Sequence, residues 1–186
     1  MAKQESDFGR GAHKDIVDVR DKKYLGMASV PFEWGKGHDI ELRLEEALKE
    51  KGVKLPIKDQ DGSFSCGGQA WGTYSAVLEA LATGTFEERS AKYIYAQVFA
   101  PGGGARGRDC CKVCVKQGVA RETFLSSYAA GNPPTAPFMQ RSQDITIDAR
   151  NDAKNAKHLT YATISPLNID SVAQSIRDNG GGVIGV

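Results

Sequence analysis

Residues 56 to 84 read PIKDQDGSFSCGGQAWGTYSAVLEALATG, and this stretch decides the fold. A polar loop that contains glycine runs into an apolar segment with the spacing of a helix. The apolar side chains that fall on one face of that helix are Ala70, Tyr74, Val77, Leu78 and Leu81. Cys66 lies at the start of the helix, and Gly84 is placed to end it. Because glycine costs about 1 kcal/mol relative to alanine inside a helix, the glycines near its start indicate that another group comes close. The sequence therefore predicts a central helix.

Composition places the chain among ordinary globular proteins. Of its 186 residues, 40% are hydrophobic and 25% are charged, which is enough to bury one core and excludes disordered and collagen-like chains. The formal net charge is +1; residues 1–93 hold 14 basic and 16 acidic side chains, and the remainder holds 10 and 7. Neither half has the excess of one sign that marks a nucleic-acid or membrane surface, so we expect neither partner.

The sequence shows neither a membrane span nor a targeting segment. No stretch approaches the roughly 20 apolar residues that cross a bilayer. The opening MAKQESDFGRGAHKDIVDVR lacks the apolar core of a secretory signal, so a cytoplasmic location is expected. Three of the four cysteines are Cys110, Cys111 and Cys114. Four are too few for a disulfide framework, and we expect reduced thiols.

Further elements are predicted on both sides of the central helix. Residues 1–37 are polar and punctuated by glycine, which indicates an extended segment, and residues 39–52 have the spacing of an amphipathic helix. Ser90 is placed to cap a second helix, and Asp109 to cap a third that Gly118 ends. Between these two helices lies the glycine-rich loop PGGGARGRD.

The last third of the chain is predicted to mix loop, helix and strand. The stretch GNPPTAPFMQ at 131–140 has the composition of a surface loop. Residues 148–156 have weak helical character, residues 158–164 alternate as a strand does, and residues 169–178 have the pattern of an amphipathic helix. The apolar run GGVIGV at 181–186 indicates a buried strand.

Gln60 and Cys66, six residues apart, carry the clearest chemistry. A cysteine thiol has an ordinary pKa of about 8.5, and the partial positive charge at a helix N-terminus favours the thiolate, which is the nucleophile. An amide side chain just upstream can donate a hydrogen bond to the oxyanion that forms when the thiolate attacks a carbonyl carbon. The pair predicts covalent catalysis by Cys66.

This arrangement resembles the papain-like cysteine peptidases. In that family a glutamine, a short loop with glycine and serine, and the catalytic cysteine that opens the central helix follow one another, as Gln60-Asp61-Gly62-Ser63-Phe64-Ser65-Cys66 do here. Further matches follow in order: SAVLEAL at 75–81, Ser90, the glycine run at 102–104, and Gln117-Gly118-Val119. The similarity runs from about residue 56 to residue 186.

The resemblance implies an α+β fold, the papain-like cysteine peptidase fold. Residues 38–140 would form a helical lobe that carries the nucleophile. Residues 141–186 would begin a β-rich lobe whose remaining strands lie past the end of the chain, so that the domain is truncated at its C-terminus. Residues 1–37 would precede both lobes as an extended N-terminal segment.

By the same resemblance, Cys66 is the nucleophile and Gln60 the oxyanion donor of a peptidase that hydrolyses peptide bonds through a thiol acyl-enzyme. Gly103 and Gly104 would line the cleft, where an extended substrate backbone pairs as an added strand. The implied partner is a peptide or protein substrate, with a protein inhibitor or a complementing chain as further partners. The resemblance implies no metal and no other cofactor.

A histidine base is expected outside this chain. In papain-like enzymes the histidine and asparagine follow the nucleophile by about 130–150 residues, which places them here past Val186. His158 lies only 92 residues after Cys66 and does not match that position, while His13 and His38 lie upstream.

Two positions depart from the family pattern, and two alternatives stay open. Gly67 stands where an aromatic residue usually follows the nucleophile, and Ser63 stands where secreted relatives have a structural cysteine. One alternative is a non-catalytic papain-like module that binds peptides or proteins. The other is a thiol or metal-binding protein centred on Cys111 and Cys114, although a closed zinc site needs four ligands and no second CxxC or HxxxH pair exists.

Overall fold

The structure, a computed structural model, describes residues 12–16, 45–46, 48–50, 52, 55–129, 134–164, 168–179 and 181–183. Most of the predicted extended segment at 1–37 and of the helix predicted at 39–52 lies outside the described residues. Within that helix, residues 45–46 and 48–50 are helical. The strand predicted at 181–186 is described only at residues 181–183, which are irregular.

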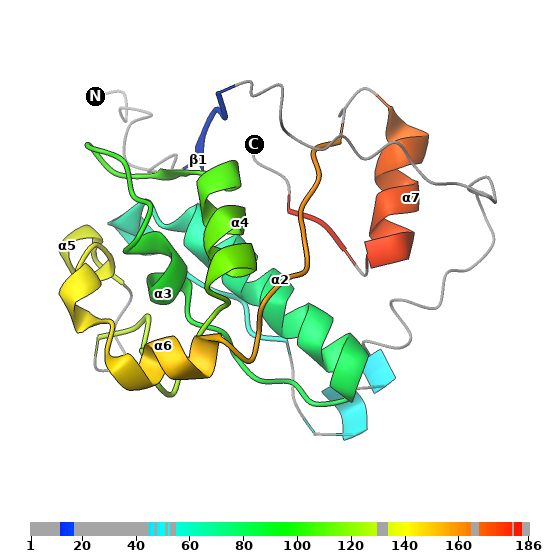
Figure 1. The fold of residues 1–186 in the computed structure, drawn as a ribbon, viewed down its shortest axis with the longest axis horizontal. Helices are drawn as coiled ribbons and strands as arrows, with labels where there is room; N and C mark the ends of the chain where they lie inside the picture. The colour runs from blue at the N-terminus through cyan, green and yellow to red at the C-terminus, as the bar shows by residue number, and fades with distance from the viewer. Residues whose placement is uncertain are drawn as a thin grey trace, which may run out of the picture.

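The described residues form several helices and one short parallel sheet, in which β1 pairs with β2 (Figure 1). The elements are β1 (Ala12–His13), η1 (Asp61–Ser63), α2 (Cys66–Thr83), α3 (Ala91–Tyr95), β2 (Ala105–Arg106), α4 (Gly107–Lys116), α5 (Ala136–Met139), η2 (Ser142–Asp144), α6 (Ile147–Ala153) and α7 (Ile169–Asn179). The long helix α2 runs through the middle of the molecule, with α5 and α6 toward one side and α7 toward the other (Figure 1).

The predicted central helix is confirmed, but its predicted buried face is wrong. α2 begins at Cys66, and Gly84 ends it in a left-handed conformation with φ of 70°. The buried residues of α2 are small or polar: Gly68, Gln69, Gly72, Ser75, Ala76 and Ala80. Of the predicted apolar face, Ala70 is exposed and the larger side chains are only half-buried.

Small residues face α3 because the backbone at the start of α3 comes very close to α2. A Cβ added at Gly68 would lie 2.6 Å from the carbonyl oxygen of Ala91, and one added at Gly72 would lie 2.9 Å from that of Arg89. Main-chain atoms cannot move aside as a flexible side chain can, so both positions require glycine. The predicted close approach near the start of α2 is confirmed. Ser90 caps α3 as predicted, since its hydroxyl accepts the N–H of Tyr93 at 3.0 Å.

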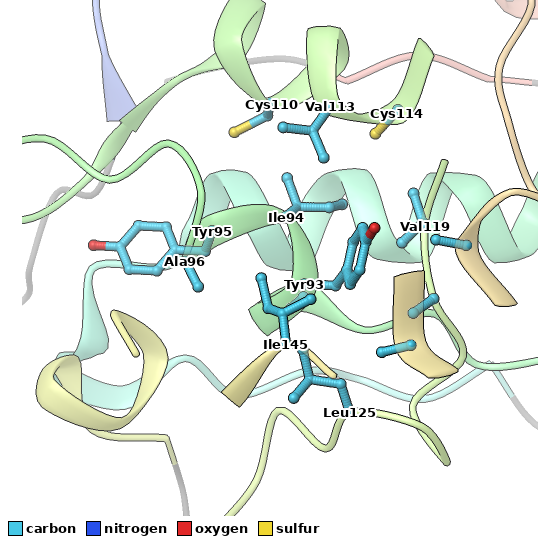
Figure 2. Packing of buried hydrophobic residues seen from close by; sticks show 14 of the residues in the cluster. Tyr93, Ile94, Tyr95, Ala96, Cys110, Val113, Cys114, Val119, Leu125 and Ile145 are labelled. Carbon is cyan, nitrogen blue, oxygen red and sulfur yellow. The ribbon is translucent and has the colours of Figure 1, made fainter. Parts of the chain in front are cut away.

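The core lies between α3 and α4. Tyr93, Ile94 and Tyr95 are at most 1% exposed, and α4 directs Cys110, Val113 and Cys114 toward them (Figure 2). Full burial of an aliphatic side chain such as that of Ile94 contributes about 1.5–3 kcal/mol. This packing fixes the glycine-rich loop that joins the two helices.

A buried ion-pair network joins α2, α6 and the segment before α3. Arg89, 3% exposed, donates to both carboxylate oxygens of Glu79 at 3.0 and 2.6 Å and to the carbonyl oxygen of Val119 at 3.0 Å. Asp152 accepts the backbone N–H and two guanidinium N–H groups of Arg121. Burial alone would raise the pKa of Asp152, but the hydrogen bonds and charge of Arg121, with the charge of Arg89, hold that pKa below its usual value.

α4 begins earlier than predicted. Its first residue is Gly107, and Asp109 lies in the first turn rather than at the cap. The carboxylate of Asp15 accepts the N–H of Arg108 at 3.1 Å, so an acidic residue distant in the sequence satisfies a donor in the first turn of the helix. The predicted end is confirmed: Gly118 has φ of 86°, and a Cβ there would lie 1.8 Å from the carbonyl oxygen of Ala153.

Two predictions for the last third are wrong and two are confirmed. Within the predicted loop at 131–140, residues 136–139 form α5, which Thr135 caps. Residues 158–164 form no strand in the described part of the chain: Leu159 is 98% exposed, and Thr163 makes only an isolated bridge. The helices predicted near 148–156 and 169–178 are observed as α6 and α7. Among the described residues, no helix is both long and apolar enough for a bilayer.

Candidate active site

Cys66 occupies the position at which a helix most favours a thiolate. It is the first residue of the 18-residue helix α2, and the preceding residue, Ser65, does not cap the helix with its side chain. The partial positive charge of the exposed N–H groups therefore acts at the Cys66 sulfur. Cys66 is half-buried and lines a cavity.

The other three thiols have different surroundings. Cys110 and Cys114 are fully buried, and burial raises the pKa of both, that of Cys114 to about 12. Cys111, 3% exposed, donates its S–H to the carbonyl oxygen of Arg108. Among the described residues, no group of three or more His, Cys, Asp or Glu side chains converges on a metal position. Of the four cysteines, Cys66 is the one suited to nucleophilic attack.

Cys66 and Gln60 lie in the wall of one cavity of about 540 Å³. The wall consists of the loop residues Pro56, Lys58 and Gln60, the α2 residues Cys66, Gln69, Ala70, Thr73, Tyr74 and Val77, and the backbone of Gly181 and Gly182. Gln60 Oε1 is buried and has no hydrogen-bond partner in the described part of the chain. The structure therefore brings the predicted nucleophile and the predicted oxyanion donor together.

The loop from Asp59 to Ser65 sets the distance between these two residues. It contains η1 and two non-glycine residues in left-handed conformation, Asp61 with φ of 44° and Phe64 with φ of 57°. The ring of Phe64 lies against Gly103, where an added Cβ would come within 3.1 Å of two ring atoms. Gly103 thus contacts the loop that leads to Cys66.

Gly103 and Gly104 are not extended, and they are outside the described wall of the cavity. Gly102, Gly103 and Gly104 have φ of 85°, 96° and 79°, a conformation that glycine adopts at little cost. Gly104 donates its N–H to the hydroxyl of Tyr95 at 2.9 Å, which fixes the run on α3. Regular pairing begins only at Ala105, in β2.

A segment of the same chain lies along this edge. Ala12 and His13 pair in parallel with Ala105 and Arg106, and His13 Nε2 is 2.7 Å from the carbonyl oxygen of Gly103. The edge predicted to receive a substrate backbone already has a partner strand. Nothing in the sequence of residues 12–16 indicated this pairing, because a two-residue strand leaves no periodic pattern.

His158 packs on α2 far from Cys66. Its Nε2 is 2.8 Å from the hydroxyl of Ser75, and its ring lies against the rings of Trp71 and Tyr74. Ser75 is nine residues after Cys66, which corresponds to about 13 Å along a helix at 1.5 Å per residue. The ring of His158 is therefore not a partner for the Cys66 thiol.

Cysteine proteases of known structure are similar to this chain. Xylellain, a cysteine protease from Xylella fastidiosa, matches with a TM-score of 0.62 and 22% sequence identity, over 96% of this chain and 66% of that chain. The chain has the papain-like cysteine protease fold. A second match, the ragweed pollen allergen and cysteine protease Amb a 11 in its proform, has a TM-score of 0.39 and 22% identity, over 53% of this chain and 29% of that chain. No family model and no curated protein matches the sequence.

The papain-like fold confirms the fold class that the sequence predicts. Within this fold, the glycine at position 67, directly after Cys66, has a physical explanation. A Cβ added at Gly67 would lie 3.2 Å from Cys110 Sγ and 3.8 Å from the Cβ of Ala105. The Cys110 side chain therefore fills the space into which a larger residue at 67 would point.

From the sequence alone, no structural role was assigned to three polar residues beside this candidate site. The side chains of Ser63, Ser65 and Gln69 form a buried hydrogen-bond chain between Gln60 and α2. One signal was Ser63, which departs from the papain-like pattern.

Proposed function

We propose that this chain carries the nucleophile and the oxyanion donor of a papain-like cysteine peptidase that hydrolyses peptide bonds. One observation carries the proposal: in the fold of a cysteine protease, Cys66 opens the central helix in the wall of the cavity that also contains Gln60. The substrate is a peptide or a protein.

The Cys66 thiolate attacks the carbonyl carbon of the scissile bond. Negative charge moves to the carbonyl oxygen, which accepts hydrogen bonds from the Gln60 side-chain amide and the Cys66 backbone N–H. The C–N bond then breaks, the amine leaves with a proton from a histidine, and a thioester to Cys66 remains. Water activated by the same histidine hydrolyses the thioester and restores the thiol.

The histidine of this mechanism is proposed to follow Val186 in a longer polypeptide. His13 and His158 are each engaged by other groups, Gly103 and Ser75 respectively. His38 lies outside the described residues. The chain spans 66% of the xylellain chain that it matches, which supports a further part of the domain.

Gly103 and Gly104 are proposed to hold the substrate backbone. An incoming strand that uses the Gly103 carbonyl must displace the ring of His13 from it. Substrate binding at this edge therefore competes with the chain's own segment at residues 12–16.

A peptide epoxide that alkylates papain-like nucleophiles tests the proposal. We expect it to modify Cys66 faster than Cys110, Cys111 or Cys114, because burial holds two of those thiols protonated and a hydrogen bond engages the third. Peptide mapping locates the adduct, and Cys66→Ala is the control. Equal, slow modification of all four cysteines, both in this chain and in a polypeptide extended past Val186, would contradict the proposal.

A Gln60→Ala variant tests the second role. Loss of one oxyanion donor typically lowers kcat by about 100- to 1,000-fold, so in a polypeptide that includes the downstream histidine, peptide hydrolysis should fall while alkylation of Cys66 continues. Selective binding of a peptide without cleavage, in a chain that includes the downstream histidine, would favour the alternative of a non-catalytic binding module. The pairing of β1 with β2 supports that alternative, since this edge already accepts an extended segment.

The cytoplasmic location remains a prediction, which cell fractionation can test.

A further inference from the structure

A chain of side-chain hydrogen bonds joins the first turn of α2 to the backbone of Gln60. Gln69 Nε2 donates to Ser65 Oγ at 3.4 Å, and the hydroxyl oxygens of Ser65 and Ser63 lie 2.7 Å apart. Ser63 Oγ donates to the carbonyl oxygen of Gln60 at 2.5 Å. The chain thus bridges the two ends of the loop that separates Gln60 from Cys66.

The protons along this chain have a single consistent order. A hydroxyl donates one proton, so Ser63, which donates to the Gln60 carbonyl, accepts from Ser65. Ser65 in turn accepts from the amide of Gln69. Ser63 and Ser65 are 0% exposed and Gln69 is 6% exposed, so water does not compete for these bonds.

Gln60 is held through its backbone alone among the described residues. Its carbonyl oxygen accepts both the hydroxyl and the backbone N–H of Ser63, the latter at 3.0 Å. Its side-chain oxygen is buried without a hydrogen-bond partner. The backbone of Gln60 therefore sets the point from which its side chain reaches the cavity wall.

The loop needs such a restraint because its backbone is strained. Asp61 and Phe64 both have positive φ, and a non-glycine residue in that region costs about 1–2 kcal/mol. Strain of this kind persists only where neighbouring contacts impose it, and it gathers at functional sites. Here the serine hydroxyls supply contacts within the loop, and the packing of Phe64 on Gly103 supplies a contact to the glycine run.

We propose that Ser63 and Ser65 are positioning residues, which hold the Gln60 amide at the place where it meets the oxyanion formed on a substrate of Cys66. The inference rests on the proposed function of Cys66 and Gln60 and adds two residues to it. Ser63 and Ser65 act through Gln60 and do not themselves contact the substrate.

Two reagents separate positioning from a general loss of structure. A peptide aldehyde adds to Cys66: the S–C bond forms, the carbonyl π bond breaks, and the oxygen becomes the hemithioacetal oxyanion or hydroxyl that Gln60 would stabilise. Iodoacetamide alkylates the same sulfur by displacing iodide and forms no oxyanion. The purified full chain is compared with Ser63→Ala, Ser65→Ala, Gln60→Ala and the double variant S63A/Q60A. Ser142→Ala, at an exposed residue of η2 that does not line the cavity, is the matched control.

We expect Ser63→Ala to weaken aldehyde binding by about tenfold, since displacements of 1 Å in a site can cost up to about 100-fold. The iodoacetamide rate should stay at the native value. In the Gln60→Ala background, the Ser63→Ala change should have no further effect on aldehyde binding, because Ser63 acts through Gln60. Ser63→Thr, which keeps the hydroxyl, should retain native affinity and serves if Ser63→Ala does not fold.

Two results would overturn this inference and leave the proposed function of Cys66 and Gln60 standing. An equal loss of aldehyde binding on Ser63→Ala with and without the Gln60 side chain would show a role independent of Gln60. A parallel fall in the iodoacetamide rate would show general damage to the helix start. If a polypeptide that includes the downstream histidine binds the aldehyde no better than its Cys66→Ala variant does, the proposed function fails, and this inference fails with it.

Discussion

The two faces of α2 are built by opposite means. Toward α3, glycine and other small residues bring main chain against main chain, with added-Cβ distances of 2.6 Å at Gly68 and 2.9 Å at Gly72. Toward the cavity, the larger side chains of Thr73, Tyr74 and Val77 are half-buried around a space of about 540 Å³. One helix is thus a rigid support on one face and a wall of the proposed site on the other. The position of Cys66 depends on the first face, and its access on the second.

The sharpest test of this comparison is a single added methyl group. Gly68→Ala should destabilise the fold by about 3 kcal/mol, at the upper end for overpacking, because the contact is with the main-chain oxygen of Ala91. Thr73→Ala on the cavity face should change stability by less than about 0.5 kcal/mol. Urea unfolding followed by circular dichroism measures both. Similar values for the two variants would show that the faces do not differ in tolerance.

Arg89 contacts the face of α2 that packs on α3, and its replacement should have the next largest effect on stability. Its carbonyl oxygen lies over Gly72, while its guanidinium returns to Glu79 on α2. Arg89→Met keeps the length but leaves Glu79 and the Val119 carbonyl without this donor, so we expect a loss of about 2 kcal/mol. Arg150→Met, at an exposed position of α6, is the control for thermal unfolding. An unchanged midpoint for Arg89→Met would contradict the structural role of the ion pair.

His158, which packs on α2, should make the stability of the fold depend on pH. Burial lowers the pKa of His158, so the unfolded chain takes up a proton at higher pH than the native chain does. Stability is therefore full above about pH 6.5 and decreases as the pH falls through that value. His158→Gln should cost about 1 kcal/mol near neutral pH through the altered contact with Ser75, and should remove this slope. Urea unfolding at about pH 5 and about pH 8 measures it; a slope that persists in the variant belongs to another group.

The smallest effect is expected at Tyr74. Its hydroxyl donates to the carbonyl oxygens of Asn179 and Gly181, which ties the segment after α7 to the cavity face. Tyr74→Phe removes only this partly exposed bond, at a cost of about 0.5 kcal/mol. Hydrogen exchange should speed up near residues 179–183 and stay unchanged in α3. Faster exchange in α3 as well would mean that the two faces are not independent.

The sequence predicted the features that depend on residues close together in the chain. The helix from Cys66 to Gly84, the Ser90 cap and the end of α4 at Gly118 follow from spacing and from residues with few permitted conformations. The juxtaposition of Cys66 and Gln60 followed from a resemblance in spacing, and the structure places both in one cavity wall. Their roles, with those of Gly103 and Gly104, remain proposals.

What failed depends on contacts between distant segments. The alternation at 158–164 predicted a strand, but His158 donates its N–H to the carbonyl oxygen of Cys114, so the end of α4 and not a neighbouring strand holds this segment. Asp109 was predicted to cap a helix, but α4 begins at Gly107, and Asp15 accepts the N–H of Arg108 in its first turn. Periodicity also assigned the wrong buried face to α2, since it weighs side-chain apolarity and not the space a neighbouring backbone leaves.

The contact between Gly67 and Cys110 has a consequence for sequence variation. Because the Cys110 sulfur stands 3.2 Å from the place of a Gly67 side chain, the two positions share one volume. A bulky residue directly after Cys66 then requires a residue smaller than cysteine at position 110. In homologues of this chain the two positions should covary, so that the identity of one forecasts the size of the other.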